Sequence, residues 1–140
     1  MSYLWDTNIV IYYLQQQFPA FPEAYMDELL EQHTPVISAI TEIELLSWKN
    51  ASPQDITVIG SFIRDARVIE LDPDIKIKTA DIRKTCGLKM PDAIIAASAL
   101  IHNLTLLTRN VSDFKKIPQL KIINPWEPPT TIDPKEGLRY

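Results

Sequence analysis

Glycine is scarce in this chain of 140 residues, which contains only Gly60, Gly87 and Gly137. The phosphate-binding loops GxGxxG and GxxxxGKS/T need closely spaced glycines, because there the backbone must approach a phosphate group. Neither pattern is present in the sequence. The glycine content therefore excludes a dinucleotide-binding enzyme and a P-loop enzyme.

The chain is also poor in cysteine and in long apolar runs. Cys86 is its single cysteine, so no internal disulfide can form, which is typical of proteins in a reducing cytosol. No apolar run approaches the roughly 20 residues that span a bilayer. The sequence has no basic segment followed by an apolar one, so we expect no signal peptide. We therefore expect a cytoplasmic protein that does not enter a membrane.

An excess of positive charge is missing as well, because 14 Lys and Arg face 18 Asp and Glu and give a net charge of -4. This argues against a strongly basic nucleic-acid footprint but leaves room for a local basic patch. Such a patch is formed in the sequence by five residues that lead towards Asp92: Lys76, Lys78, Arg83, Lys84 and Lys89. They are either a solvated helix face or a track for nucleic-acid phosphates.

Short apolar runs alternate with segments of helical periodicity along most of the chain. The runs that read as strands lie at 3–5, 35–38, 67–71, 104–108 and 121–123. The segments that read as helices lie at 8–17, 23–33, 39–48, from 53, at 72–86 and at 91–102. This alternation predicts a three-layer α/β/α domain with a central, mostly parallel sheet. We assign it to residues 1–126 and expect a poorly packed, Pro-rich tail at 127–140.

Four acids follow the predicted strands or begin the helices. Asp6 ends the first strand inside the apolar stretch LWDTNIVIYYL, and Glu44 lies one turn into the helix after the second strand. Asp92 begins a later helix, and Asp113 follows the strand at 104–108. Because the carboxyl ends of parallel strands share one edge of the sheet, we expect these side chains to converge there.

Each acid, taken alone, also has a purely structural explanation. Asp6 fits a helix N-cap, and Glu44 completes a capping box with Thr41. Asp92 would interact with a helix dipole, and Asp113 would be a solvated loop residue.

A cluster of all four acids would need a cation. Carboxylates about 5 Å apart repel each other by roughly 3 kcal/mol per pair at an effective dielectric of 20. Oxygen ligands alone suit a hard divalent ion such as Mg²⁺ or Mn²⁺. A zinc site is not indicated, because the candidate nitrogen and sulfur ligands are isolated along the chain: His33, His102 and Cys86.

Five short motifs occur in an order that matches a known family. They are LWDTNIVI, ISAITEIELL, MPDAIIAASAL, LLTRNVSDF and INPW. On these motifs the chain resembles the PIN-domain ribonucleases, in particular the VapC toxins of VapB/VapC toxin–antitoxin pairs. The resemblance covers nearly the whole chain except the tail and implies that residues 1–126 form a PIN domain.

The resemblance also implies roles for individual residues. Asp6, Glu44 and Asp92 match three metal-binding, catalytic acids of the family, and Glu42 lies on a different helical face from Glu44. The fourth ligand is either the carboxylate of Asp113 or the amide oxygen of Asn110, with Asp113 favoured. Whether the acids bind one metal ion or two depends on that fourth ligand.

Neighbouring polar residues have two interpretations each. Thr7, Asn8 and Thr108 would either orient the carboxylates or cap helices. Arg109 would contact either a phosphate or a surface acid. The aromatic residues of the first 25 positions are mainly core. Some of four that crowd a short helix and a turn would line a groove for a partner helix: Tyr12, Tyr13, Phe18 and Phe21.

The activity implied by the resemblance is Mg²⁺- or Mn²⁺-dependent cleavage of RNA phosphodiester bonds. It further implies a homodimer and a VapB-type antitoxin whose carboxyl-terminal segment blocks the acidic site. One rival hypothesis is a catalytically silent PIN-like binding module. Another is a phosphotransfer receiver domain, which is disfavoured because Trp5-Asp6 and Thr108-Arg109 replace its adjacent acids and its late lysine.

Overall fold

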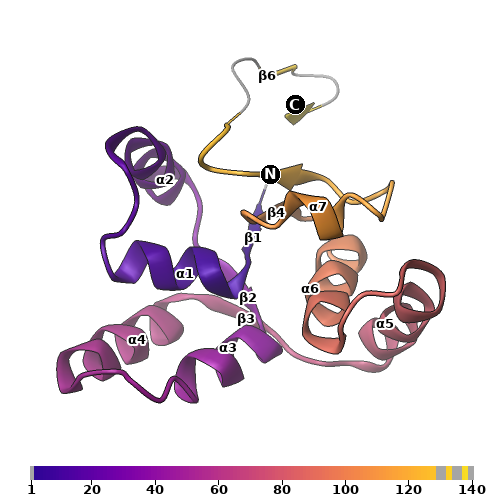
Figure 1. Ribbon diagram of the computed structural model, residues 1–140, viewed down its shortest axis with the longest axis horizontal. Helices are drawn as coiled ribbons and strands as arrows, with labels where there is room; N and C mark the ends of the chain where they lie inside the picture. Colours follow the sequence, from indigo (N-terminus) through magenta and orange to yellow (C-terminus); the bar gives the residue numbers. More distant parts are fainter. Residues whose placement is uncertain (1, 129–131, 134–136, 139–140) are drawn as a thin grey trace.

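A five-stranded parallel sheet forms the centre of the molecule (Figure 1). The computed structural model describes residues 2–128, 132–133 and 137–138. The strands of the sheet are β1 (Tyr3–Trp5), β2 (Val36–Ser38), β3 (Arg67–Ile69), β4 (Thr105–Leu107) and β5 (Ile122–Ile123). Their spatial order is β3-β2-β1-β4-β5, and every neighbouring pair is parallel. The predicted sheet is therefore confirmed, and β1 lies at its centre.

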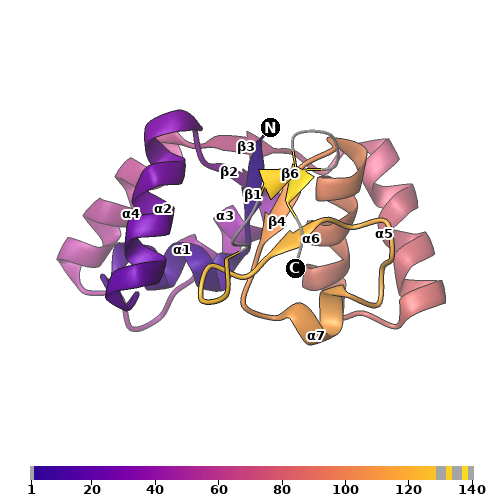
Figure 2. The same cartoon turned by 90° about the horizontal axis from the view of Figure 1, so that it is seen from above.

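Helices cover both faces of this sheet, as Figure 2 shows. On one side lie α1 (Thr7–Leu14), α2 (Ala20–Gln32) and α4 (Pro53–Asp65). On the other side lie α5 (Pro73–Cys86), α6 (Met90–Ile101) and the short α7 (Val111–Phe114). Helix α3 (Ala39–Leu46) contacts α1, α4 and α6. This is the predicted three-layer α/β/α architecture.

Alternate side chains of the strands serve the two faces. Leu4 belongs to a buried cluster with residues of α5 and α6, whereas Tyr3 and Trp5 belong to a second cluster with residues of α1, α2 and α4. This alternation follows from the period of two in a strand. Because helices cover both faces of the sheet, side chains on both sides of a strand are buried. The short strands are therefore mostly continuous apolar runs in the sequence.

The helix boundaries follow local signals in most places. Ser52 and Asp55 form a capping box at α4, and Asp72 caps α5, which ends at Gly87 with φ 68°. Helix α2 begins at Ala20, three residues before the predicted start, because Pro22 is compatible with the first turn of a helix. The predicted loop around Asp113 is instead the single-turn helix α7.

The predicted tail holds two short strands, β6 (Ile132–Asp133) and β7 (Gly137–Leu138), which pair antiparallel. Other residues of the tail lie outside the described part of the chain, so the boundary at residue 126 stays a prediction. Among the helices that the structure describes, none combines the length and the apolar character needed to cross a bilayer.

Candidate active site

Asp6 lies buried at the carboxyl end of β1, with an exposed fraction of 6%. Its backbone N–H donates to the carbonyl of Leu107, which continues the pairing of β1 with β4. Its side chain is the N-cap of α1 and accepts from the N–H of Thr7 at 2.8 Å. Its other carboxylate oxygen accepts from the hydroxyl of Thr108 at 2.8 Å. Asp6 is thus a helix cap, as one prediction held, but it also joins the ends of two central strands.

The charge of Asp6 has no cationic partner within the described residues, since neither of the two ion pairs there involves it. The pKa of Asp6 is raised from its usual 3.8 to about 6, chiefly by burial, although the hydrogen bond from Thr108 lowers it. The carboxylates of Asp92 and Glu44 contribute to the raised value, and the Thr7 N–H acts against it. Asp6 therefore bears a carboxylate whose ionised form the protein alone stabilises poorly.

Glu44 is brought to Asp6 by the hydroxyl of Thr7. Thr7 Oγ1 lies 2.7 Å from Glu44 Oε1 and 2.9 Å from Thr41 Oγ1, so one buried hydroxyl connects α1 with α3. The alternative role of Glu44 in a capping box is wrong, because the N-cap of α3 is Ser38, whose hydroxyl accepts from the N–H of Ile40. Glu44 is therefore oriented by a residue of the Asp-Thr-Asn motif and not by its own helix start.

Asp92 lies in the first turn of α6 and interacts electrostatically with the other acids. Partial burial raises the pKa of Asp92, and the charges of Asp113 and Glu44 raise it further, while Lys89 lowers it. Because Asp92 also raises the pKa of Asp6, its carboxylate is within electrostatic range of all three other acids. The structure thus brings the four predicted acids to one edge of the sheet.

The fourth position involves Asn110 and Asp113 together. The side-chain amide of Asn110 donates to Asp113 Oδ2 at 3.0 Å, and the backbone N–H of Asn110 donates to Thr108 Oγ1 at 3.0 Å. Lys116 lies 3.8 Å from the other oxygen of Asp113. Asn110 therefore directs its amide NH₂ at Asp113, which leaves the carboxylate as the better candidate ligand and makes Asn110 its support.

The acids are close enough to affect each other's charge, but they are not gathered around a single point. In the part of the chain that the structure describes, no group of three or more His, Cys, Asp or Glu is placed to hold a metal ion. Mg²⁺ commonly keeps several waters and takes only one or two protein carboxylates. An all-oxygen set of donors around a buried, uncompensated Asp6 fits such an ion.

The remaining predicted residues have distinct positions. Asn8 is exposed on α1 and takes part in none of the side-chain hydrogen bonds among residues 2–128, whereas Thr7 and Thr108 are buried. Arg109 lies over the ring of Trp126, and the two ion pairs of the described region do not include it. Sequence reasoning gave Trp126 no function, although INPW follows the last strand and so falls at the same sheet edge.

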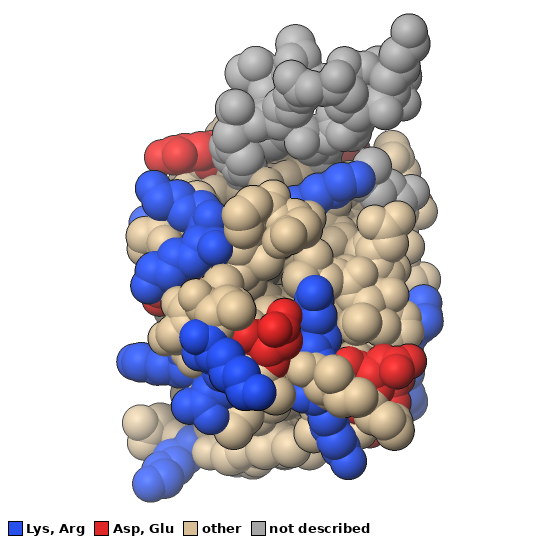
Figure 3. All heavy atoms as spheres, turned by 90° about the vertical axis from the view of Figure 1, so that its right-hand side faces the viewer, with Lys and Arg blue, Asp and Glu red and all other residues tan. Residues whose placement is uncertain are grey.

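Basic side chains are spread over the face that carries α5 (Figure 3). Three of the five residues of the predicted phosphate track, Lys76, Arg83 and Lys84, border a hollow of about 430 Å³ that also contains Met90 of α6. None of the four acids lines this hollow, but Met90 lies two residues before Asp92. The track therefore stays a prediction.

The chain is similar in sequence to known proteins. The sequence profile of the PIN domain matches residues 3–120. The chain belongs to the PIN-domain family. It is 28% identical to "Ribonuclease VapC2" of Rickettsia felis over 138 residues, which cover 91% of this chain and 99% of that protein.

Two solved structures show the same PIN architecture. The crystal structure of VapBC2 from Rickettsia felis, bound to a promoter DNA fragment, matches with a TM-score of 0.76 and 26% identity, covering 89% of this chain and 98% of that one. A toxin–antitoxin complex from Klebsiella pneumoniae matches with a TM-score of 0.72 and 31% identity, covering 90% of this chain and 99% of that one. This PIN domain is therefore similar over most of its length to proteins of toxin–antitoxin complexes.

Proposed function

We propose that this PIN-domain protein is a metal-dependent endoribonuclease and the toxin of a toxin–antitoxin pair. The observation that carries the proposal is the buried Asp6, whose pKa is raised to about 6 by burial and by its neighbours Asp92 and Glu44. A buried carboxylate without a cation destabilises the fold, so its presence at the edge of a sheet indicates a functional site. The ribonuclease name of the VapC2 relative supports RNA as the substrate class.

In this proposal the four acids Asp6, Glu44, Asp92 and Asp113 hold one or two Mg²⁺ or Mn²⁺ ions. When bound, a divalent ion supplies an activated water at neutral pH and offsets the charge that develops on the phosphate. The protein's own contribution is orientation. Thr108 and the N–H of Thr7 fix Asp6, the Thr7 hydroxyl fixes Glu44, and the Asn110 amide fixes Asp113.

The distribution of charge supports an RNA substrate. Residues 72–121, which form α5, α6, β4 and α7, contain nine Lys and Arg against five Asp and Glu. Residues 2–71 contain only three Lys and Arg against ten Asp and Glu. A polyanion would therefore approach over the α5–α7 side, where the field is the more positive, and reach the acids from there.

The proposed partner is a VapB-type antitoxin that covers the acidic site in the cytoplasm. Support comes from the structural relatives, which are VapBC and toxin–antitoxin complexes. We also propose a homodimer, because α3 and α5 expose large apolar side chains that a second copy would cover: Ile43, Leu46 and Ile77. Light scattering of the purified protein tests the dimer, and co-expression with the neighbouring open reading frame tests the antitoxin.

The decisive experiment compares wild type with Asp6→Asn in two assays, growth arrest after induction and cleavage of total RNA with and without Mg²⁺. We expect wild type to arrest growth and to cut RNA only with the metal ion, and Asp6→Asn to do neither. Asp65→Asn, an exposed acid at the end of α4, is the matched control and should behave as wild type. A silent binding module would instead show equal behaviour of wild type and Asp6→Asn.

A further inference from the structure

Arg109 occupies the position between two residues that hold candidate acids. Thr108, before it, donates to Asp6, and Asn110, after it, donates to Asp113. The backbone N–H of Asn110 also donates to Thr108 Oγ1, so hydrogen bonds fix the chain on both sides of Arg109. The starting point of the Arg109 side chain is therefore fixed relative to the acidic site.

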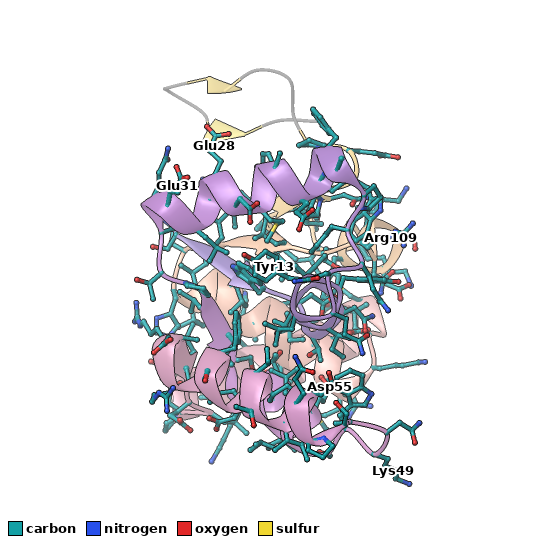
Figure 4. All side chains as sticks on the ribbon, turned by 90° about the vertical axis from the view of Figure 1, so that its left-hand side faces the viewer. Tyr13, Glu28, Glu31, Lys49, Asp55 and Arg109 are labelled. Atoms are coloured by element: carbon teal, nitrogen blue, oxygen red, sulfur yellow. The ribbon has the colours of Figure 1, made fainter. Side chains whose placement is uncertain are left out.

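The guanidinium group of Arg109 lies on an aromatic surface. Its central carbon is 4.3 Å from the ring centroid of Trp126 and 5.8 Å from that of Tyr12. Its Nη1 donates to the Tyr12 hydroxyl at 3.5 Å. Figure 4 shows Arg109 near the turn that joins α1 to α2, at the margin of the face formed by α1, α2 and α4. The rings thus hold a planar cation beside the site.

The aromatic surface is itself supported from three separate segments. Phe18, from the turn after α1, lies 4.7 Å from Trp126, and Tyr12 lies 5.2 Å from it, both measured between ring centroids. The buried Asn124 accepts from the backbone N–H of Trp126 at 3.0 Å and so fixes the turn that presents the ring. The guanidinium therefore rests on a platform whose position does not depend on Arg109.

The charge of Arg109 is not used for an ion pair within the described residues, and its side chain is exposed. A guanidinium has five N–H donors in a planar fork, which matches the oxygens of a phosphate. The neighbouring acids repel the phosphates of RNA. A fixed cation at the border of the acids would offset this repulsion where the RNA backbone must pass. Apart from the Nη1 bond to the Tyr12 hydroxyl, the guanidinium donates to no side chain of the described residues.

We propose that Arg109 is a positioning residue that binds a backbone phosphate of single-stranded RNA next to the acidic cluster, with Trp126 and Tyr12 holding its guanidinium in place. This assignment rests on the proposed ribonuclease function and adds to it the residue that fixes the register of the strand at the site. A purely structural role for the Arg109–Trp126 contact makes a different prediction, because losing it would not change how RNA binding responds to salt.

The test measures binding of a fluorescein-labelled single-stranded oligouridylate by anisotropy in EDTA, where cleavage is silent, over a series of salt concentrations. We expect Arg109→Ala to weaken binding by about tenfold at low salt. Because one phosphate contact is lost, the slope of log K against log salt should become shallower by about 0.7. Arg67→Ala, an exposed arginine at the start of β3, is the matched control and should leave both values unchanged.

Conservative variants separate charge from geometry. Arg109→Lys keeps the charge and should restore the slope with only part of the affinity, and Trp126→Phe keeps a ring and should retain the slope. The proposal would be overturned if Arg109→Ala had the salt slope and the thermal unfolding of wild type. It would also be overturned if Arg109→Ala lost affinity for an oligoadenylate but not for the oligouridylate, because that would indicate base stacking. A wild type that never cleaves RNA defeats the ribonuclease instead, so the two failures are distinguishable.

Discussion

The hydroxyl of Thr108, at the end of β4, donates a 2.8 Å hydrogen bond to the carboxylate of Asp6, at the end of β1, across 102 positions of sequence. The two strands are neighbours in the sheet, with Trp5 paired to Leu107, so the residues that follow them meet at the same edge. This contact lowers the pKa of Asp6 against the effect of burial. It connects the first and the fourth motif of the sequence in one site.

Thr108→Val removes that hydrogen bond while keeping the shape of the side chain. We expect metal-dependent RNA cleavage to fall by about tenfold, because loss of a hydrogen bond to a charged group is worth roughly 1.5 kcal/mol or more. The pH at which cleavage reaches half its maximum should move upward, since the pKa of Asp6 rises. Thr108→Ser keeps the hydroxyl and serves as the control. Equal cleavage by the Val and Ser variants would contradict this role.

The stability of the metal-free protein should depend on Asp6 in a specific pH window. Its pKa is raised from 3.8 to about 6 in the folded state, so folding takes up protons between these values and stability falls as pH rises through them. Above pH 6 the full penalty is present, on the order of 3 kcal/mol. In EDTA at pH 7, Asp6→Asn should therefore unfold at a higher urea concentration than wild type. This difference in stability should disappear near pH 4.

Urea denaturation of both proteins at a series of pH values measures this effect. The comparison must be made as a difference between the two proteins, because Asp92 also has a raised pKa and responds in the same direction in both. Asp65→Asn, on the surface of α4, controls for the loss of a negative charge. A lower stability of Asp6→Asn at pH 7 would show that the carboxylate stabilises the fold without a metal ion.

Addition of a divalent ion should reverse that penalty. Because the ion binds the folded state and not the unfolded one, saturating Mg²⁺ or Mn²⁺ should raise the melting temperature of wild type by several degrees, through about 2.7 kcal/mol at a hundredfold excess over Kd. Asp6→Asn and Asp92→Asn should lose most of this shift, while Asp65→Asn should keep it. Thermal unfolding with Ca²⁺ and Zn²⁺ in parallel tests the preference for hard oxygen-seeking ions.

The sequence predicted the sheet, the helix alternation and the meeting of four acids because these follow from period and topology. Asp6 follows β1 directly and Asp92 lies in the first turn of α6, so the parallel sheet determines where they point. Glu44 lies one turn or more into α3 and is held by the hydroxyl of Thr7. The capping box of Thr41 and Glu44, which the sequence leaves open as an alternative, does not form, because Ser38 is an equally good cap three residues earlier and only the backbone decides between them. The aromatic support of Arg109 depends on contacts between Tyr12, Phe18 and Trp126, which no local pattern encodes.

Asp113 is the fourth acid of the candidate site. Asp113 receives the amide of Asn110 and acts electrostatically on Asp92, so its carboxylate would contribute to the metal site directly while Asn110 only orients it. Asp113→Asn should therefore reduce metal-dependent cleavage about a hundredfold, and Asn110→Ala only about tenfold, in line with loss of a supporting contact to a ligand. Asn110→Ser has a smaller side chain that is still polar, so its metal-dependent cleavage should lie between that of Asn110→Ala and that of wild type.

Titration of Mg²⁺ in the cleavage assay separates the two residues. If Asp113 is a ligand, Asp113→Asn needs a higher Mg²⁺ concentration for half-maximal activity. Lys116→Ala removes the cation 3.8 Å from Asp113, makes the potential at the site more negative and should need less Mg²⁺. The opposite order, with Asn110→Ala more damaging than Asp113→Asn, would assign the fourth position to the amide oxygen of Asn110. The Mg²⁺ requirement therefore decides between a carboxylate and an amide at this corner of the site.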